Sequence, residues 1–84
     1  MMNKIIVEIY VPIMGKTYDV FVPKNKKISE INKLLSKSIS DLTDGMFIMT
    51  DENILCDRNT GKVFDINLSV CELGIKNGSK LMLI

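Results

Sequence analysis

The sequence contains no histidine and no tryptophan, and it has only two cysteines among 84 residues. Histidine is the side chain that most often acts as a general base near neutral pH, and it is the commonest metal ligand. Its absence removes the usual centre of hydrolase and transferase mechanisms, and no other constellation of catalytic side chains is evident. We therefore predict that the protein is not an enzyme and that it holds no metal or cofactor.

The two cysteines, Cys56 and Cys71, form no Cys-x-x-Cys motif. In a reducing compartment such thiols stay free, and the pair gives no sign of a disulfide or of a redox site. We interpret both as small apolar residues at half-buried positions. Their role stays open at this point.

The chain also lacks an excess of charge and a long apolar run. Eleven basic and ten acidic residues leave a net charge of +1, which argues against a nucleic-acid partner. No apolar run approaches the ~20 residues that cross a bilayer. The apolar residues 5–7 are interrupted by Glu8, and no small-residue cleavage site follows. We expect one cytoplasmic domain, residues 1–84, without direct membrane insertion.

Two stretches near the start alternate apolar and polar side chains, which is typical of strands with one buried face. They cover residues 4–11 and 16–22 and flank the turn Pro12-Ile13-Met14-Gly15, so they predict a hairpin. An amphipathic helix is predicted over residues 28–39, where the spacing of three and four joins Ile28, Ile31, Leu34, Leu35 and Ile39. Residues 40–53 show no clear period, and we expect a short extended segment over the edge of the core.

The second half of the sequence is predicted to form short secondary-structure elements. Residues 54–56 and 62–64 form short strands around a turn-rich loop, residues 68–75 form a tight helical turn, and residues 80–84 form a final strand. That last strand must dock among earlier strands to bury its apolar side chains, and the middle of the sheet, parallel to the first strand, is the expected place. The fold class is therefore α+β, a mixed four- to five-stranded sheet with one main helix on one face.

Several motifs in this order resemble ubiquitin, namely Gly15-Lys16-Thr17, Leu68-Ser69 and Ser79-x-Leu81-x-Leu83. The tail is more similar to the small ubiquitin-like proteins of the YukD/EsaB type, which accompany type VII (ESX-like) secretion in Gram-positive bacteria. The residues that carry this similarity are Asn59 to Asp65, Val70, Leu73 to Gly78, and Leu81-x-Leu83-Ile84. The resemblance implies a ubiquitin-like β-grasp fold and an accessory or regulatory role in secretion through docking to protein partners; the oligomeric state stays open.

Ubiquitin and the related sulfur carriers end in a mobile tail that closes with Gly-Gly. Here the sequence ends in Leu83-Ile84 within the final predicted strand, so the resemblance favours a protein that is not conjugated. Two alternatives remain open at this stage. The chain could be a ubiquitin-like domain cut from a larger membrane-anchored secretion subunit, or a truncated sulfur carrier or modifier.

Strand alternation predicts an apolar surface for partner binding. If Leu81 and Leu83 face the helix, Met82 and Ile84 emerge on the open face of the sheet. By the same parity Ile54 and Cys56 would lie beside them, and Met14 could close the rim. A contiguous exposed apolar area on a small protein usually marks a contact site. The alternative is that residues 40–53 fold back and cover this face as a second core.

A second candidate site is basic. Lys24, Lys26 and Lys27 follow the predicted hairpin and could be joined by Lys33 and Lys37 on the helix. Such a patch would suit an acidic partner or lipid headgroups. The alternative is an ordinary solvated connection.

Overall fold

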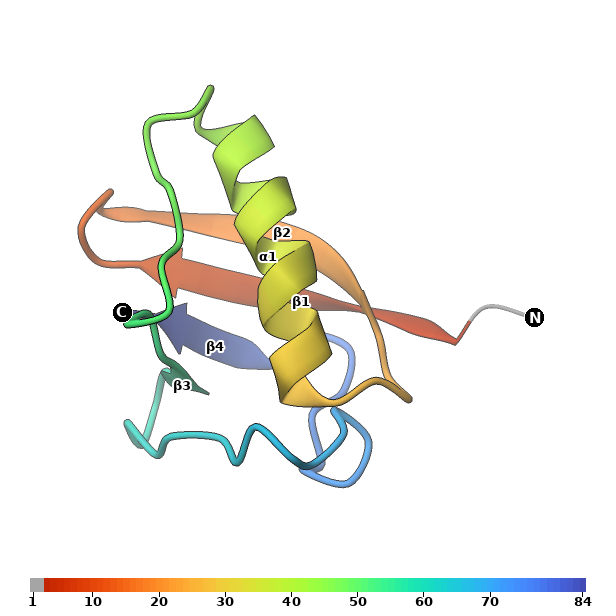
Figure 1. Cartoon of the computed structure of the whole chain (residues 1–84). Coiled ribbons are helices and arrows are strands. Elements are labelled where there is room, and N and C mark those ends of the chain that lie inside the picture. The colour runs from red at the N-terminus through yellow and green to blue at the C-terminus, as the bar shows by residue number, and fades with distance from the viewer. Residues whose placement is uncertain (1–2) are drawn as a thin grey trace.

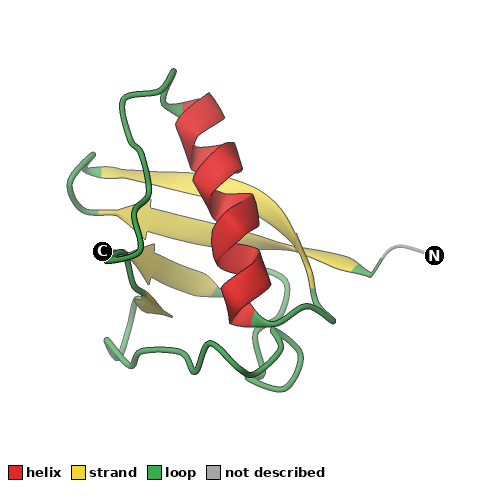
Figure 2. Ribbon diagram, in the orientation of Figure 1, coloured by secondary structure: helices red, strands yellow, loops and turns green. Residues whose placement is uncertain are grey.

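A computed structural model describes residues 3–84 of the chain (Figure 1). Its elements are, in order, β1 (Lys4–Val11), β2 (Lys16–Pro23), α1 (Ile28–Leu42), β3 (Leu55–Asp57) and β4 (Lys80–Leu83). The strands form one sheet in the order β2-β1-β4-β3, and α1 lies across one face of it (Figure 2). The predicted mixed sheet with a single helix on one face is confirmed, with four strands.

The predicted hairpin is confirmed, with β1 and β2 antiparallel over their full lengths from Lys4 opposite Pro23 to Val11 opposite Lys16. The turn closes by a hydrogen bond from the Met14 N–H to the Val11 carbonyl at 3.0 Å. Gly15 completes it with φ of 63°, in the left-handed region that glycine enters without steric cost. The hairpin therefore follows from local turn chemistry and from alternation on both sides of the turn.

The last strand lies where the sequence predicts it. β4 pairs in parallel with β1, with Ile9 opposite Leu81 and Tyr10 opposite Met82, and pairs antiparallel with β3. The Glu8 N–H donates to the Ser79 carbonyl at 2.9 Å at the start of this ladder. β1 and β4 are consequently the two central strands of the sheet.

The core lies between the sheet and α1. Alternate residues of β1 and β4 face the helix, and the helix contributes one apolar stripe in return. Leu34 departs from the prediction, since its side chain is 44% exposed. The largest fully buried side chains include Ile9, Ile28, Ile31, Leu35, Ile39 and Leu83.

α1 begins where predicted but continues to Leu42, three residues beyond the predicted end. Its first turn has no side-chain cap. Instead, the N–H groups of Ile28 and Ser29 donate to the carbonyls of Leu68 (2.9 Å) and Ile66 (3.1 Å). Those two N–H groups would otherwise lack partners inside the helix. The segment near residue 67 therefore fixes the start of the helix.

Residues 43–53 form an irregular connection on the helix side of the sheet (Figure 1). Phe47 is buried in the core, and Met49 packs against it. The Thr43 hydroxyl is buried, donates to the Ile39 carbonyl at 2.9 Å, and accepts the Phe47 N–H at 3.1 Å. The expected extended segment is therefore a loop pinned to the helix end, and it does not cover the opposite face of the sheet.

The strand predicted over residues 62–64 is wrong, because the structure has only an isolated bridge between Cys56 and Val63 there. Two hydrogen bonds flank the bridge, from the Asp57 N–H to the Lys62 carbonyl (2.9 Å) and from the Phe64 N–H to the Leu55 carbonyl (3.2 Å). β3 is only three residues long, so the ladder cannot continue.

The tight turn before β4 carries a reciprocal cap. The Ser69 N–H donates to a Glu72 carboxylate oxygen at 2.9 Å, and the Glu72 N–H donates to the Ser69 hydroxyl at 3.1 Å. The hydrogen bond from the Ser69 N–H, with a smaller contribution from the Ser69 side chain, holds the pKa of Glu72 below its usual value. The turn that leads into β4 is thus closed by its own polar side chains.

Candidate docking surface

An apolar patch occupies the face of the sheet that α1 leaves uncovered. Ile54 and Ile84 continue the β3–β4 ladder through two hydrogen bonds, Ile54 N–H to Ile84 carbonyl (2.7 Å) and Ile84 N–H to Ile54 carbonyl (2.9 Å). Their side chains are 42% and 51% exposed. Backbone pairing therefore holds two large exposed apolar side chains next to each other, and strand parity places Met82 on the same face. We call Tyr10, Ile54, Met82 and Ile84 the outer-face patch.

Tyr10 extends the patch onto the neighbouring strand, because it lies directly opposite Met82 in the parallel register. The guanidinium carbon of Arg58 lies 4.3 Å from the centre of the Tyr10 ring, within the range of a cation–π interaction. Arg58 also reaches the Thr17 hydroxyl at 3.5 Å. The side chain of Arg58 thus crosses the outer face from β3 to β2 and borders the patch with a positive charge.

The next row of the same face is charged. Lys80, Glu8 and Asp19 lie opposite one another across β4, β1 and β2. Ile6 and Phe21 form an apolar pair beyond that row. The outer-face patch is therefore a bounded apolar area at one end of the sheet, the kind of surface that marks protein contacts.

The prediction that Cys56 contributes contact surface is wrong. Its side chain is on the same side as Met82 by parity, but only 1% of the residue is exposed. The bridge to Val63 brings a further segment against this strand, and the Cys56 thiol approaches the Met82 carbonyl at 3.6 Å. Burial, and secondarily the neighbouring Asp57 charge, raises the pKa of the thiol. Cys56 therefore lies on the outer face of the sheet but is covered and offers no contact surface.

Met14 does not close the rim of the patch, and that prediction is also wrong. The residue is half-buried and packs against the core on the helix side of the sheet. The exposed apolar residue of the hairpin turn is instead Ile13, at 82%.

The three lysines of the predicted basic patch are all exposed in the connection between β2 and α1. Lys26 lies 3.7 Å from Glu30, and Lys27 contributes to the lowered pKa of Glu72. The backbone carbonyls of Lys24 and Lys26 accept N–H groups from the turn before β4. Part of this positive charge is therefore compensated locally, and the segment also has a structural role.

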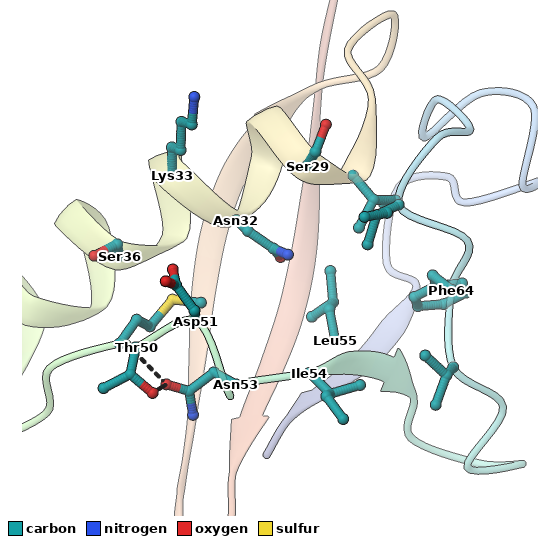
Figure 3. A pocket seen from close by; sticks show the side chains of 14 residues that line it. Ser29, Asn32, Lys33, Ser36, Thr50, Asp51, Asn53, Ile54, Leu55 and Phe64 are labelled. Carbon is teal, nitrogen blue, oxygen red and sulfur yellow. Dashed lines mark hydrogen bonds between the residues drawn. The ribbon is translucent and has the colours of Figure 1, made fainter.

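A pocket of about 470 Å³ opens between α1 and the connection that leads to β3 (Figure 3). Asn32 points into it from the helix, and Leu55 points toward the helix while Ile54 points away. The Asn32 side-chain oxygen is buried and has no hydrogen-bond partner among residues 3–84. A hydrogen-bond donor that entered this pocket would satisfy the Asn32 oxygen.

Neither the pocket nor the patch presents a metal site, and residues 3–84 contain no group of three or more acidic or cysteine side chains placed to hold an ion. Within the same residues, no helix has both the length and the apolar character needed to cross a membrane. The surfaces that remain are the outer-face patch, the basic connection and the pocket beside α1.

No protein-family model matches the chain, and a search of curated proteins finds no significant match. Solved structures do match. The EccD5 ubiquitin-like domain from Mycobacterium xenopi is 21% identical, with a TM-score of 0.78, over 96% of this chain and 92% of that one. The ubiquitin-like domain of the Mycobacterium tuberculosis type VII secretion protein ECCD1 is 16% identical, with a TM-score of 0.78, over 99% of both chains.

A third similar structure is a chain of the MycP5-free ESX-5 inner membrane complex, 19% identical with a TM-score of 0.80. The match covers 98% of this chain but only 21% of that one. Ubiquitin-like domains with no stated link to secretion match nearly as well. At these identities the likeness establishes the fold, and the protein has the ubiquitin-like β-grasp fold.

Sequence reasoning missed two residues of this surface. Tyr10 could have been found, because parallel pairing of β1 with β4 in the right register places it opposite Met82. Arg58 could not, since it follows β3 in a loop whose direction depends on the Asp57 side chain. That carboxylate accepts the N–H groups of Asn59 (2.8 Å) and Thr60 (3.0 Å) and so shapes the loop.

Proposed function

We propose that this chain is a noncatalytic ubiquitin-like docking protein of a type VII-like secretion system, of the YukD/EsaB type, acting in the cytoplasm as a single domain. The outer-face patch is the observation that carries the proposal. Exposed Ile54 and Ile84 are locked side by side by paired backbone hydrogen bonds, with Met82 and Tyr10 adjoining them. A rigid apolar area with a charged border suits protein docking and needs no chemistry.

The link to secretion is supported by the similar structures whose names include type VII secretion and the ESX-5 inner membrane complex. The proposed partners are protein components of such a system. A conjugated modifier or sulfur carrier would need a flexible Gly-Gly end. A natural reading frame that continued to Gly-Gly would therefore contradict the proposal that the protein acts by docking and not by conjugation.

A second candidate is favoured by one observation, that the ESX-5 chain is about five times as long as the region matched here. The same fold can therefore be one part of a larger membrane-complex subunit. In that case the domain would dock onto another part of its own chain or onto another subunit of the same complex. The length of the natural reading frame discriminates between the two candidates.

The proposal is tested with Ile54→Asp and Ile84→Asp, separately and together. Ile13→Asp and Ile66→Asp are matched controls, since these isoleucines are 82% and 53% exposed and lie outside the patch. Affinity purification with the secretion ATPase and membrane subunits of the source organism is the assay, and circular dichroism verifies folding.

We expect the patch variants to lose the secretion subunits and to reduce export, while the controls retain both. A central apolar contact of this kind costs about 1–2 kcal/mol or more when it is removed, which is a loss of roughly tenfold or greater. Unchanged subunit recovery and unchanged export in the folded double variant would contradict the proposal.

A further inference from the structure

The turn that leads into β4 contains the dipeptide Asn77-Gly78, and Asn77 is the only asparagine of the chain that a glycine follows. Asparagine before glycine is the pair most prone to deamidation, because glycine has no side chain to hinder the attack of its backbone nitrogen on the carboxamide. Both residues are exposed, so water reaches them. The sequence therefore places its most reactive asparagine directly before the last strand.

The fold uses both residues of this pair. Gly78 has φ of 83°, in the left-handed region that other residues enter only with strain. The Asn77 side-chain oxygen accepts the Ile6 N–H at 2.9 Å. The Gly78 N–H donates to the Ile6 carbonyl, also at 2.9 Å. The turn thus needs the same two residue types that make it reactive.

These two hydrogen bonds occupy the edge of β1 just before β4 begins to pair with it. The parallel ladder starts with Glu8 opposite Lys80, and Ile6 precedes Glu8 by two residues. The turn is also closed on itself, since the Lys76 N–H donates to the Ser79 hydroxyl and the Ser79 N–H to the Lys76 carbonyl, both at 2.9 Å. The backbone groups of Ile6 are therefore satisfied by the turn, which aligns β4 with β1.

Deamidation is chemically opposed by this arrangement. In its first step the Gly78 nitrogen bonds to the Cγ of Asn77 and closes a succinimide ring. The bond from Cγ to the side-chain nitrogen breaks, and ammonia leaves with the proton that the Gly78 nitrogen gives up. The ring nitrogen then has no hydrogen to donate to Ile6, so the docked turn must release β1 before the ring can form. Water afterwards opens the ring at either carbonyl and leaves aspartate or isoaspartate.

We propose that Asn77 is a modification site that is protected while the turn is docked on Ile6 and that deamidates in chains whose β4 segment is undocked. The two products have different consequences. Aspartate keeps a side-chain oxygen that accepts the Ile6 N–H. Isoaspartate routes the backbone through the former side chain and lengthens it by a methylene group, so Lys80 can no longer align with Glu8.

The isoaspartate product therefore turns a chain that has stayed open into one that cannot complete its sheet. Met82 and Ile84 follow the turn on the same segment, so such a chain also loses the outer-face patch. The reaction needs only water and does not depend on the role of that patch.

The first test compares deamidation rates at mildly alkaline pH in the folded protein and in urea, read by mass spectrometry of proteolytic peptides. We expect Asn77 to react at least about tenfold more slowly in the folded protein, because two hydrogen bonds must break first. Asn25 and Asn59 are exposed internal controls that precede lysine and threonine, and both should react more slowly than Asn77 in urea.

A matched pair of variants opens the site without urea. Leu81 is 3% exposed on β4, and Leu81→Ala should raise the rate at Asn77 several-fold because the strand undocks more often. Ile13 is 82% exposed in the hairpin turn, and Ile13→Ala should leave the rate unchanged.

The second test separates the two products. Asn77→Asp reproduces the aspartate product and should unfold in urea close to the wild-type midpoint. Wild-type protein aged in urea is fractionated by chromatography, and isoaspartyl methyltransferase identifies the isoaspartate form. After removal of urea that form should unfold at clearly lower urea, and the Ile6 and Gly78 amides should lose their protection from hydrogen exchange.

Two results would overturn the proposal. Equal deamidation rates at Asn77 in the folded protein and in urea would show that docking on Ile6 gives no protection. Equal stability of the isoaspartate form and the Asn77→Asp protein would show that the lengthened backbone does not prevent closure of the sheet. Neither measurement involves a partner, so both outcomes leave the proposed docking function to its own test.

Discussion

Leu81 and Ile84 of the last segment face opposite sides of the sheet, and truncating each to alanine tests the arrangement on which the docking surface depends. Leu81 is only 3% exposed and Ile84 is 51% exposed. Leu81→Ala removes a packed side chain and leaves a cavity, so we expect a loss of about 3 kcal/mol in the free energy of unfolding. Ile84→Ala removes a half-exposed side chain without a closed cavity, so we expect a loss of about 1 kcal/mol.

Urea denaturation followed by far-ultraviolet circular dichroism measures both values. With a dependence of about 1 kcal/mol per molar urea for a small domain, the midpoint should fall by roughly 3 M for Leu81→Ala and roughly 1 M for Ile84→Ala. The melting temperature of Leu81→Ala should fall by roughly 12–24 °C. Equal losses, or a larger loss for Ile84→Ala, would refute the assigned facing of this strand and with it the outer-face patch.

Three further predictions concern Thr43 and the two cysteines. Thr43→Val should lower the free energy of unfolding by about 1–3 kcal/mol, because the buried Phe47 N–H loses the hydroxyl that accepts it; unchanged stability in urea would contradict this role. In the folded protein, iodoacetamide near pH 8 should alkylate exposed Cys71 and spare buried Cys56 until urea is added, as read by mass spectrometry. Folding raises the pKa of the Cys56 thiol, so the neutral thiol stabilises the folded protein. This stabilisation is complete below the ordinary thiol pKa and is lost as the pH rises through the raised pKa. A Cys56→Ala protein should not show this loss of stability at alkaline pH.

The hairpin and the central position of β4 were predictable because each follows from a local pattern with one physical solution. Alternation on both sides of a Gly-containing turn specifies β1 and β2. A strand late in the chain can pair along both of its edges only if it inserts between strands already formed. The fold class follows from those two requirements and the amphipathic helix.

The bounds of α1 were less predictable at its C-terminal end. Ile39 is the last buried side chain of the helix, so the apolar spacing stops there. The backbone nevertheless continues to Leu42, because the Thr43 hydroxyl and N–H both bond back to the Ile39 carbonyl and Gly45 then turns the chain with φ of 78°. A cap made by a residue after the helix leaves no periodic signal in the sequence.

Strand alternation predicted which residues of the candidate site face the outer side of the sheet, but it did not predict which of them are exposed. Strand alternation alone separates Met82 and Ile84 from Leu81 and Leu83. Whether a residue on the outer face is exposed depends on segments far along the chain, as Cys56 shows through its bridge to Val63.

The parallel pairing of β1 with β4 has a consequence for synthesis on the ribosome. During translation β1 and β2 can form their hairpin early, but the other side of β1 has no partner until residues 80–83 have emerged. Contacts between strands so distant in sequence form slowly, because the long loop between them must first be closed. We therefore expect a nascent chain stalled just before Lys80 to expose β1 as an open, apolar edge to chaperones and to aggregation, and to become protease-resistant only once β4 is released.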